Sequence, residues 1–222
     1  MTVTLVLPDQ IAGKLFDTTA ADVETACVLL ARKVDTPAGN LRLLARAVHW
    51  VPDHAYRWRD ATGLSIASDG YVPALAAAEA DGAVPIWLHT HPGSDSSPRP
   101  SKYDELVDKQ LADLFRLRAR SPLYGAIVLA RPAGRHSFAG HIESEERRTE
   151  IDRLWVTGRR FAFIPNWCHD TTQASDQFDR NIRAFGGHIQ RVLGDLRVAV
   201  VGCGGTGSVS YTHLTLPTKR IV

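Results

Sequence analysis

Cysteine and methionine are scarce in this 222-residue chain, which contains three cysteines and one methionine. Cys27, Cys168 and Cys203 stand in three unrelated sequence environments without regular spacing. An odd and sparse set of this kind argues against a disulfide framework and is typical of a reducing compartment. We therefore expect a cytoplasmic protein whose fold depends on a hydrophobic core.

Long hydrophobic runs and blocks of like charge are also lacking. No stretch approaches the roughly 20 apolar residues that a membrane-spanning helix needs, and residues 1–10 do not resemble a signal peptide. The 26 Lys and Arg residues are scattered among 24 acids, for a net charge of +2. The hydrophobic fraction of 44% is ordinary for a globular domain. The lack of long apolar runs and of charge blocks argues against a membrane or nucleic-acid partner.

Alternating strand and helix patterns predict an α/β domain that ends near Thr157. Turn residues at 36–40 join the first two strands into a hairpin, and Ser121-Pro122 closes the longest helix. The expected helices are 9–16, 71–80 and 101–120, and the expected strands are 25–31, 41–51, 84–91, 124–130 and 137–142.

One strand and the helix after it carry residues suited to metal binding. His89 and His91 are two positions apart in a strand, so their side chains project from the same face. Ser101 is the expected N-cap of the following helix, and Asp104 lies in its first turn. Two imidazoles and a carboxylate leave a fourth position for water, which is the pattern of catalytic zinc.

Each part of this pattern has an ordinary structural interpretation when it stands alone. A Ser-x-x-Asp sequence before an amphipathic helix is commonly a capping box, and a lone His-x-His is often two unrelated histidines. The complete string is more specific: His89-Thr90-His91-Pro92, then Ser101-x-x-Asp104, with nine residues between His91 and Ser101.

This string resembles the signature of the JAMM (JAB/MPN) metallopeptidases, and the resemblance extends over about two-thirds of the chain. It implies the JAB/MPN fold, a mixed β-sheet flanked by helices, and a catalytic glutamate near the start of an early strand. Only Glu24 and Glu79 precede His89. Glu24 directly precedes an apolar strand, as in the family, whereas Glu79 lies on an Ala-rich helix, so we assign Glu24.

The resemblance implies zinc-dependent hydrolysis of a peptide or isopeptide bond. Zinc lowers the pKa of its bound water to about 7. Glu24 would accept the proton of this water and pass it to the departing amine. The Ser101 hydroxyl would donate a hydrogen bond to the developing oxyanion.

A second motif follows a segment, 158–178, that we interpret as a linker. The short apolar strand 197–201 leads into Gly202-x-Gly204-Gly205-x-Gly207-Ser208, a phosphate-binding type of loop. With Arg180 upstream, it resembles the start of a ThiF-like adenylating domain, here 179–208 and truncated after a Rossmann-like strand and glycine loop. In that family the loop binds ATP and the arginine contacts its phosphates.

The pairing of these two resemblances implies a ubiquitin-like or sulfur-carrier protein as substrate. Residues 209–222 are poor helix formers where the ThiF-like family continues as a helix, and they resemble translated vector sequence, so we exclude them from the fold. Three alternatives remain open: a non-catalytic JAMM scaffold, the DNA-repair-associated branch of the same fold, and an enzyme whose main activity is ATP-dependent adenylation.

Overall fold

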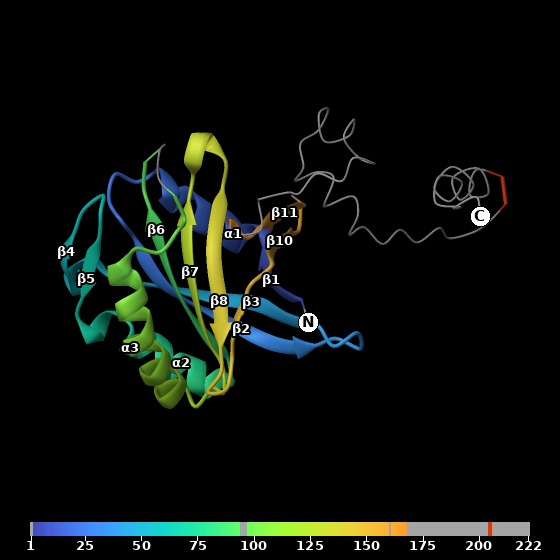
Figure 1. Cartoon of the computed structure of the whole chain (residues 1–222), viewed down its shortest axis with the longest axis horizontal. Helices are drawn as coiled ribbons and strands as arrows, with labels where there is room; N and C mark the ends of the chain where they lie inside the picture. The colour runs from blue at the N-terminus through green and yellow to red at the C-terminus, as the bar shows by residue number, and fades with distance from the viewer. Residues whose placement is uncertain (1, 94–96, 160, 168–203, 206–222) are drawn as a thin grey trace. The chain divides into compact units, whose positions relative to one another are not determined.

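A mixed β-sheet with helices on both faces forms the described part of the chain (Figure 1). The computed structural model describes residues 2–93, 97–159, 161–167 and 204–205. Among them, nine strands form one sheet in the order β11-β10-β1-β3-β2-β6-β7-β8-β9, and β4 and β5 form a separate hairpin.

The large sheet contains β1 (Val3–Pro8), β2 (Ala26–Asp35), β3 (Leu41–Trp50), β6 (Val84–His91), β7 (Tyr124–Ala130), β8 (Ser137–Glu143), β9 (Arg148–Glu150), β10 (Arg153–Thr157) and β11 (Ala162–Pro165). The hairpin consists of β4 (Tyr56–Arg59) and β5 (Leu64–Ile66). The α-helices are α1 (Asp9–Asp17), α2 (Val72–Asp81) and α3 (Lys102–Ala119). Short 3-10 helices occur at Thr18–Ala20, Asp53–Ala55, Ser68–Gly70 and Pro132–Gly134.

The sheet is curled, and Asn166 joins the region after β11 to β8. Strand β1 pairs in parallel with β3 and β10, and β6 pairs in parallel with β7. Phe138 of β8 forms an isolated parallel bridge with Asn166. The Asn166 side-chain amide donates hydrogen bonds to the carbonyl oxygens of Gly140 (3.1 Å) and Ile151 (2.8 Å). Because Asn166 is only 1% exposed, these bonds satisfy two backbone carbonyl groups that have little access to water.

Each face of the sheet is covered by its own hydrophobic layer. Helix α1 packs on one face, and α2 and α3 pack together on the other (Figure 1). Along β6, Ile86 and Leu88 join the α1 layer, whereas Trp87 joins the layer beneath α2 and α3. The alternation continues to the end of the strand, so β6 presents His89 and His91 to the side that α3 covers.

The expected α/β class and the mixed sheet flanked by helices are confirmed. The expected helices correspond to α1, α2 and α3, and β6 and β7 have the predicted bounds. Strands β1, β4, β5, β9, β10 and β11 were not expected from the sequence patterns. Strand β11 lies within the segment 158–178 that we interpreted as a linker, and it pairs antiparallel with β10.

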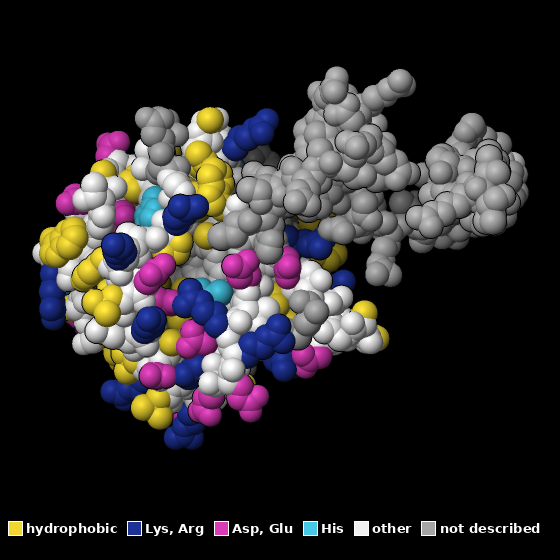
Figure 2. Space-filling view, in the orientation of Figure 1, with side chains coloured by type: hydrophobic (Ala, Val, Ile, Leu, Met, Phe, Trp, Pro, Cys, Tyr) yellow, Lys and Arg dark blue, Asp and Glu magenta, His cyan; other side chains and the backbone are white. Residues whose placement is uncertain are grey.

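Most of the predicted second domain lies outside the described residues, including Arg180, Gly202, Gly207 and Ser208, as does the tail 209–222. Gly204 and Gly205 are described; both are exposed, and Gly205 has a φ of +53°. No helix of the described residues is long and apolar enough to cross a membrane. On the face seen in Figure 2, basic and acidic side chains are interspersed.

Candidate metal centre

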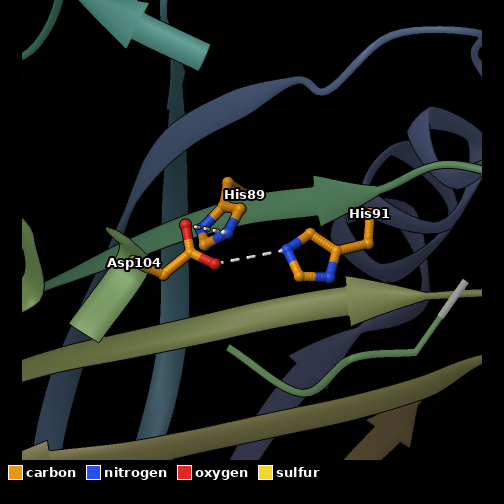
Figure 3. Close-up of side chains that lie close together, drawn as sticks. All are labelled: His89, His91 and Asp104. Carbon is orange, nitrogen blue, oxygen red and sulfur yellow. Dashed lines mark ion pairs between the residues drawn. The ribbon is translucent and has the colours of Figure 1, made fainter. Parts of the chain in front are cut away.

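The two histidines of β6 project toward the start of α3 (Figure 3). His89 is 6% exposed, and the His91 side chain is 16% exposed. His91 Nδ1 lies 2.7 Å from the Ser97 carbonyl oxygen. A carbonyl can only accept, so Nδ1 carries the proton in this contact and Nε2 is left as a free lone pair in the neutral ring. This is the tautomer that a metal-binding imidazole requires.

Asp104 comes to the histidines from the first turn of α3. Ser101 caps this helix: its Oγ accepts a hydrogen bond from the Asp104 backbone N–H (3.1 Å), and its own backbone N–H donates to Asp104 Oδ2 (2.7 Å). The same carboxylate faces both imidazoles, with Oδ1 3.4 Å from His89 Nε2 and Oδ2 3.5 Å from His91 Nε2. The capping box therefore aims the carboxylate at the histidine pair.

These three side chains fit a metal ion. Their ligand atoms all lie within 4.8 Å of one another. Atoms bound tetrahedrally to zinc at about 2.0–2.1 Å are about 3.3–3.4 Å apart, and each histidine nitrogen lies near this distance from one of the two Asp104 oxygens. Both ring nitrogens of His89 are buried without a hydrogen-bond partner among the described residues. A buried polar atom without a partner costs free energy, and a metal ligand bond would satisfy one of the two.

The charges at the centre favour cation binding. Burial alone raises the pKa of Asp104, but the two imidazoles and Ser101 outweigh this effect and hold the pKa well below its ordinary value. Asp104 is therefore a carboxylate at any physiological pH. Burial lowers the pKa of His91, whereas Asp104, the Ser97 carbonyl and Glu24 raise it, with a net rise. Protons thus compete with a metal for His91 when the pH falls.

Glu24 is held beside this cluster by the pairing of β2 with β6. Ala26 is in register with His89. Thr25, the residue before Ala26, makes two hydrogen bonds with Thr90. The Thr90 backbone N–H donates to the Thr25 carbonyl (3.0 Å), and the Thr25 N–H donates to Thr90 Oγ1 (3.0 Å). These two bonds fix the chain next to the residue between the histidines. As a result, Glu24 Oε1 lies 3.8 Å from His91 Nε2.

The surroundings of Glu24 suit a proton acceptor. The residue is 3% exposed, and burial raises the pKa of its carboxyl group, although the imidazoles of His89 and His91 oppose the rise. A raised pKa makes the carboxylate a stronger proton acceptor. Glu79 differs, because it forms an ion pair with Arg120 (2.8 Å) at an exposed position. Of the two candidate glutamates, Glu24 is the one that the structure brings to the histidines.

A cavity of about 560 Å³ adjoins His89 and Asp104. Its walls come from β5, α3 and the α3-facing side of β6 to β9, and they combine apolar side chains with a few charged ones. This volume lies in the range of small-molecule and peptide sites. The lining residues nearest in sequence to the metal cluster are Trp87, His89, Arg99, Pro100, Tyr103, Asp104 and Glu105.

A second polar cluster, which we did not predict from the sequence, lies on the same cavity wall. Asp108 is buried on α3 and accepts hydrogen bonds from the Tyr124 hydroxyl (2.9 Å) and Arg148 Nη1 (3.0 Å). His141 Nε2 lies 3.3 Å from the same carboxylate without making a hydrogen bond. One signal was available: Asp108 stands in the apolar stripe of α3, one turn before Leu111, where an acid must be buried.

Protonation of His141 should destabilise the fold in acid. Burial, together with the Arg148 charge, lowers the pKa of His141 to about 3, whereas an unfolded imidazole has a pKa of about 6.5. Between these values the unfolded chain binds a proton that the folded chain does not. The free energy of unfolding should therefore fall as the pH drops from about 6.5 toward 3, by roughly 2 kcal/mol at pH 4.5.

Urea unfolding of the metal-free chain at pH 7 and 4.5 measures this loss, with His141→Gln as the comparison. The variant should lose less stability than the unmodified chain over the same interval. The comparison is needed because burial raises the pKa of Asp108, which acts in the opposite direction. Equal losses in the two chains would contradict the assignment of the effect to His141.

No protein-family model matches the sequence, and no curated protein matches it significantly.

Proposed function

We propose that the chain is a zinc-dependent peptidase or isopeptidase of the JAMM type. The observation that carries the proposal is the buried carboxylate of Glu24, 3.8 Å from His91 Nε2, beside a group of two imidazoles and one carboxylate that could hold a metal ion. A structural metal site needs no additional buried acid, whereas metal-dependent hydrolysis needs a base next to the ligands.

His89 Nε2, His91 Nε2 and a carboxylate oxygen of Asp104 would hold the zinc ion. When bound, zinc supplies Lewis-acid chemistry, because it polarises an amide carbonyl and acidifies water. Glu24 accepts the proton of the attacking water and delivers it to the departing amine nitrogen, so that the amine leaves as a neutral group. No side-chain nucleophile is required.

Ser101 and the cavity would support the same reaction. The Ser101 Oγ accepts from the Asp104 N–H, so its hydroxyl proton can be donated to the oxygen that gains charge as the carbonyl is attacked. The cavity of about 560 Å³ would receive an extended peptide segment beside the scissile bond. Its apolar lining excludes water around that segment and its charged groups orient it.

The substrate class that we propose is a ubiquitin-like or sulfur-carrier protein, cut near its C-terminus. The mixed, curled sheet with α1 on one face and α2 and α3 on the other is compatible with the JAB/MPN fold. The glycine motif from Gly202 to Ser208 supports a link to ThiF-like activation of such a protein with ATP. The proposed substrate class thus rests on the two sequence motifs together with the metal-site geometry.

Cleavage by the zinc-loaded chain tests the proposal. The substrates are ubiquitin and a sulfur-carrier protein, each extended at its C-terminus by a short peptide or joined to a lysine side chain. We expect hydrolysis of at least one bond type, its loss when a chelator removes zinc, and its recovery when zinc is restored. Binding of these proteins without cleavage would favour the non-catalytic scaffold, and neither binding nor cleavage would contradict the proposed substrate class.

A further inference from the structure

The first turns of α3 carry Asp104 but have little apolar anchorage. Between Lys102 and Val107 no residue is buried, Tyr103 and Leu106 are 54% and 57% exposed, and Val107 alone of these residues packs partly against the core. The buried apolar residues of the helix begin at Leu111. Apolar packing therefore holds the C-terminal half of α3 on the sheet and leaves the turn of Asp104 without comparable support.

The capping box does not replace this support. The two hydrogen bonds of the box join Ser101 and Asp104 to each other, so the box orients the Asp104 carboxylate relative to the helix axis. It does not fix the helix relative to β6, which carries both histidines. The 3.4 Å and 3.5 Å distances from Asp104 to the imidazoles need a tie between α3 and the sheet.

Asp108 supplies such a tie one helical turn after Asp104. Residues four apart lie on the same face of a helix, and Asp108 is the first buried residue of α3. Its carboxylate contacts the Tyr124 hydroxyl of β7 and the Arg148 guanidinium of β9. Strand β7 is in turn paired with β6, where Val128 is in register with His89. A short chain of contacts thus joins Asp108 to the strand of the histidines.

We propose that Asp108 is a positioning residue that holds Asp104 at the metal centre. The inference rests on the proposed zinc site but not on hydrolysis. Asp108 is not one of the three residues that could hold the metal; it acts by fixing the N-terminal turns of α3 against β7 and β9. Partners that orient metal ligands typically contribute about 10- to 100-fold to metal affinity.

Zinc titration of the full chain against a competing chelator tests this role. Asp108→Ala should raise the zinc dissociation constant by about 10- to 100-fold. Tyr124→Phe removes a single hydroxyl and should raise it by a smaller factor, which provides a milder variant if Asp108→Ala does not fold. Leu111→Ala is the matched control, because it loosens the same helix at its first buried apolar residue while leaving the groups that contact Asp108 unchanged, and it should leave zinc affinity within about threefold.

A double-mutant cycle separates positioning from a general loss of structure. In an Asp104→Ala background there is no carboxylate ligand to position, so adding Asp108→Ala should change the remaining zinc affinity by less than about threefold. An undiminished 10- to 100-fold effect in that background would overturn the inference, as would equal losses in Asp108→Ala and Leu111→Ala. A chain that binds zinc tightly but hydrolyses nothing contradicts the proposed function alone, whereas no zinc binding by the unmodified chain overturns both.

Discussion

Replacing His89 by Ala should abolish tight zinc binding and reduce hydrolysis to the level without metal. The variant retains only two of the three protein ligands, His91 and Asp104. The metal-free fold should lose only the packing of the His89 ring and its contact with Asp104, because both ring nitrogens lack hydrogen-bond partners among the described residues. The largest losses should therefore appear in metal binding and turnover.

Thermal unfolding with and without zinc measures this outcome. A ligand present at 100 times its dissociation constant stabilises the folded state by about 2.7 kcal/mol, so the unmodified chain should show a clear rise in melting temperature. His89→Ala should show no rise. His54→Ala, at an exposed position on the 3-10 helix Asp53–Ala55, is the control and should respond to zinc like the unmodified chain. Retention of the zinc response by His89→Ala would remove His89 from the ligand set.

Glu24→Gln should lower the rate of hydrolysis by roughly 10²- to 10⁴-fold, the usual contribution of a general acid–base residue. Glutamine has the same shape but cannot take up a proton. Zinc affinity should change little, because the ligand set consists of His89, His91 and Asp104. Folding stability should be unchanged or slightly higher, since burial of the ionised Glu24 side chain is unfavourable and raises its pKa.

Glu79→Gln is the matched control for this change. It neutralises the other glutamate that precedes the histidines, and it breaks an exposed ion pair with Arg120 that contributes little to stability. Turnover should remain within a factor of two of the unmodified chain. A large loss in Glu79→Gln together with a normal rate in Glu24→Gln would show that the wrong glutamate has been assigned.

Elements with a strong local signal could be predicted from the sequence. Strands β6 and β7 are nearly continuous apolar runs, typical of strands buried on both faces, and their predicted bounds agree with the structure. Helix α3 begins after the Ser101 capping box and carries a regular apolar stripe. In each case one short segment contains the information that determines the element.

The missed strands depend on partners far away in the chain. Strand β1 pairs with β10, about 150 residues later, and with β3. Strands β9 and β11 are short edge segments whose state is decided by β8 and β10. Local propensity carries little information about such non-local pairings, because side-chain packing against the neighbouring strand decides them.

In the candidate site, too, some residues could be placed from local patterns and others only from long-range contacts. The spacing of His89, His91 and Asp104 follows from strand alternation and a helix start, both of which are local. The nearness of Glu24 depends on the register of β2 against β6, for which the sequence offered only a resemblance. The role of Asp108 required the positions of Tyr124 and Arg148, which lie 16 and 40 residues away.

X-ray absorption at the zinc edge, measured on the zinc-loaded full chain, tests the central claim most directly. The account predicts one zinc per chain with four ligands of nitrogen or oxygen at about 2.0–2.1 Å, two of them imidazoles. His89→Ala should remove this signal. Sulfur ligands at about 2.3 Å, or a spectrum without imidazole scattering, would contradict a centre built from His89, His91 and Asp104.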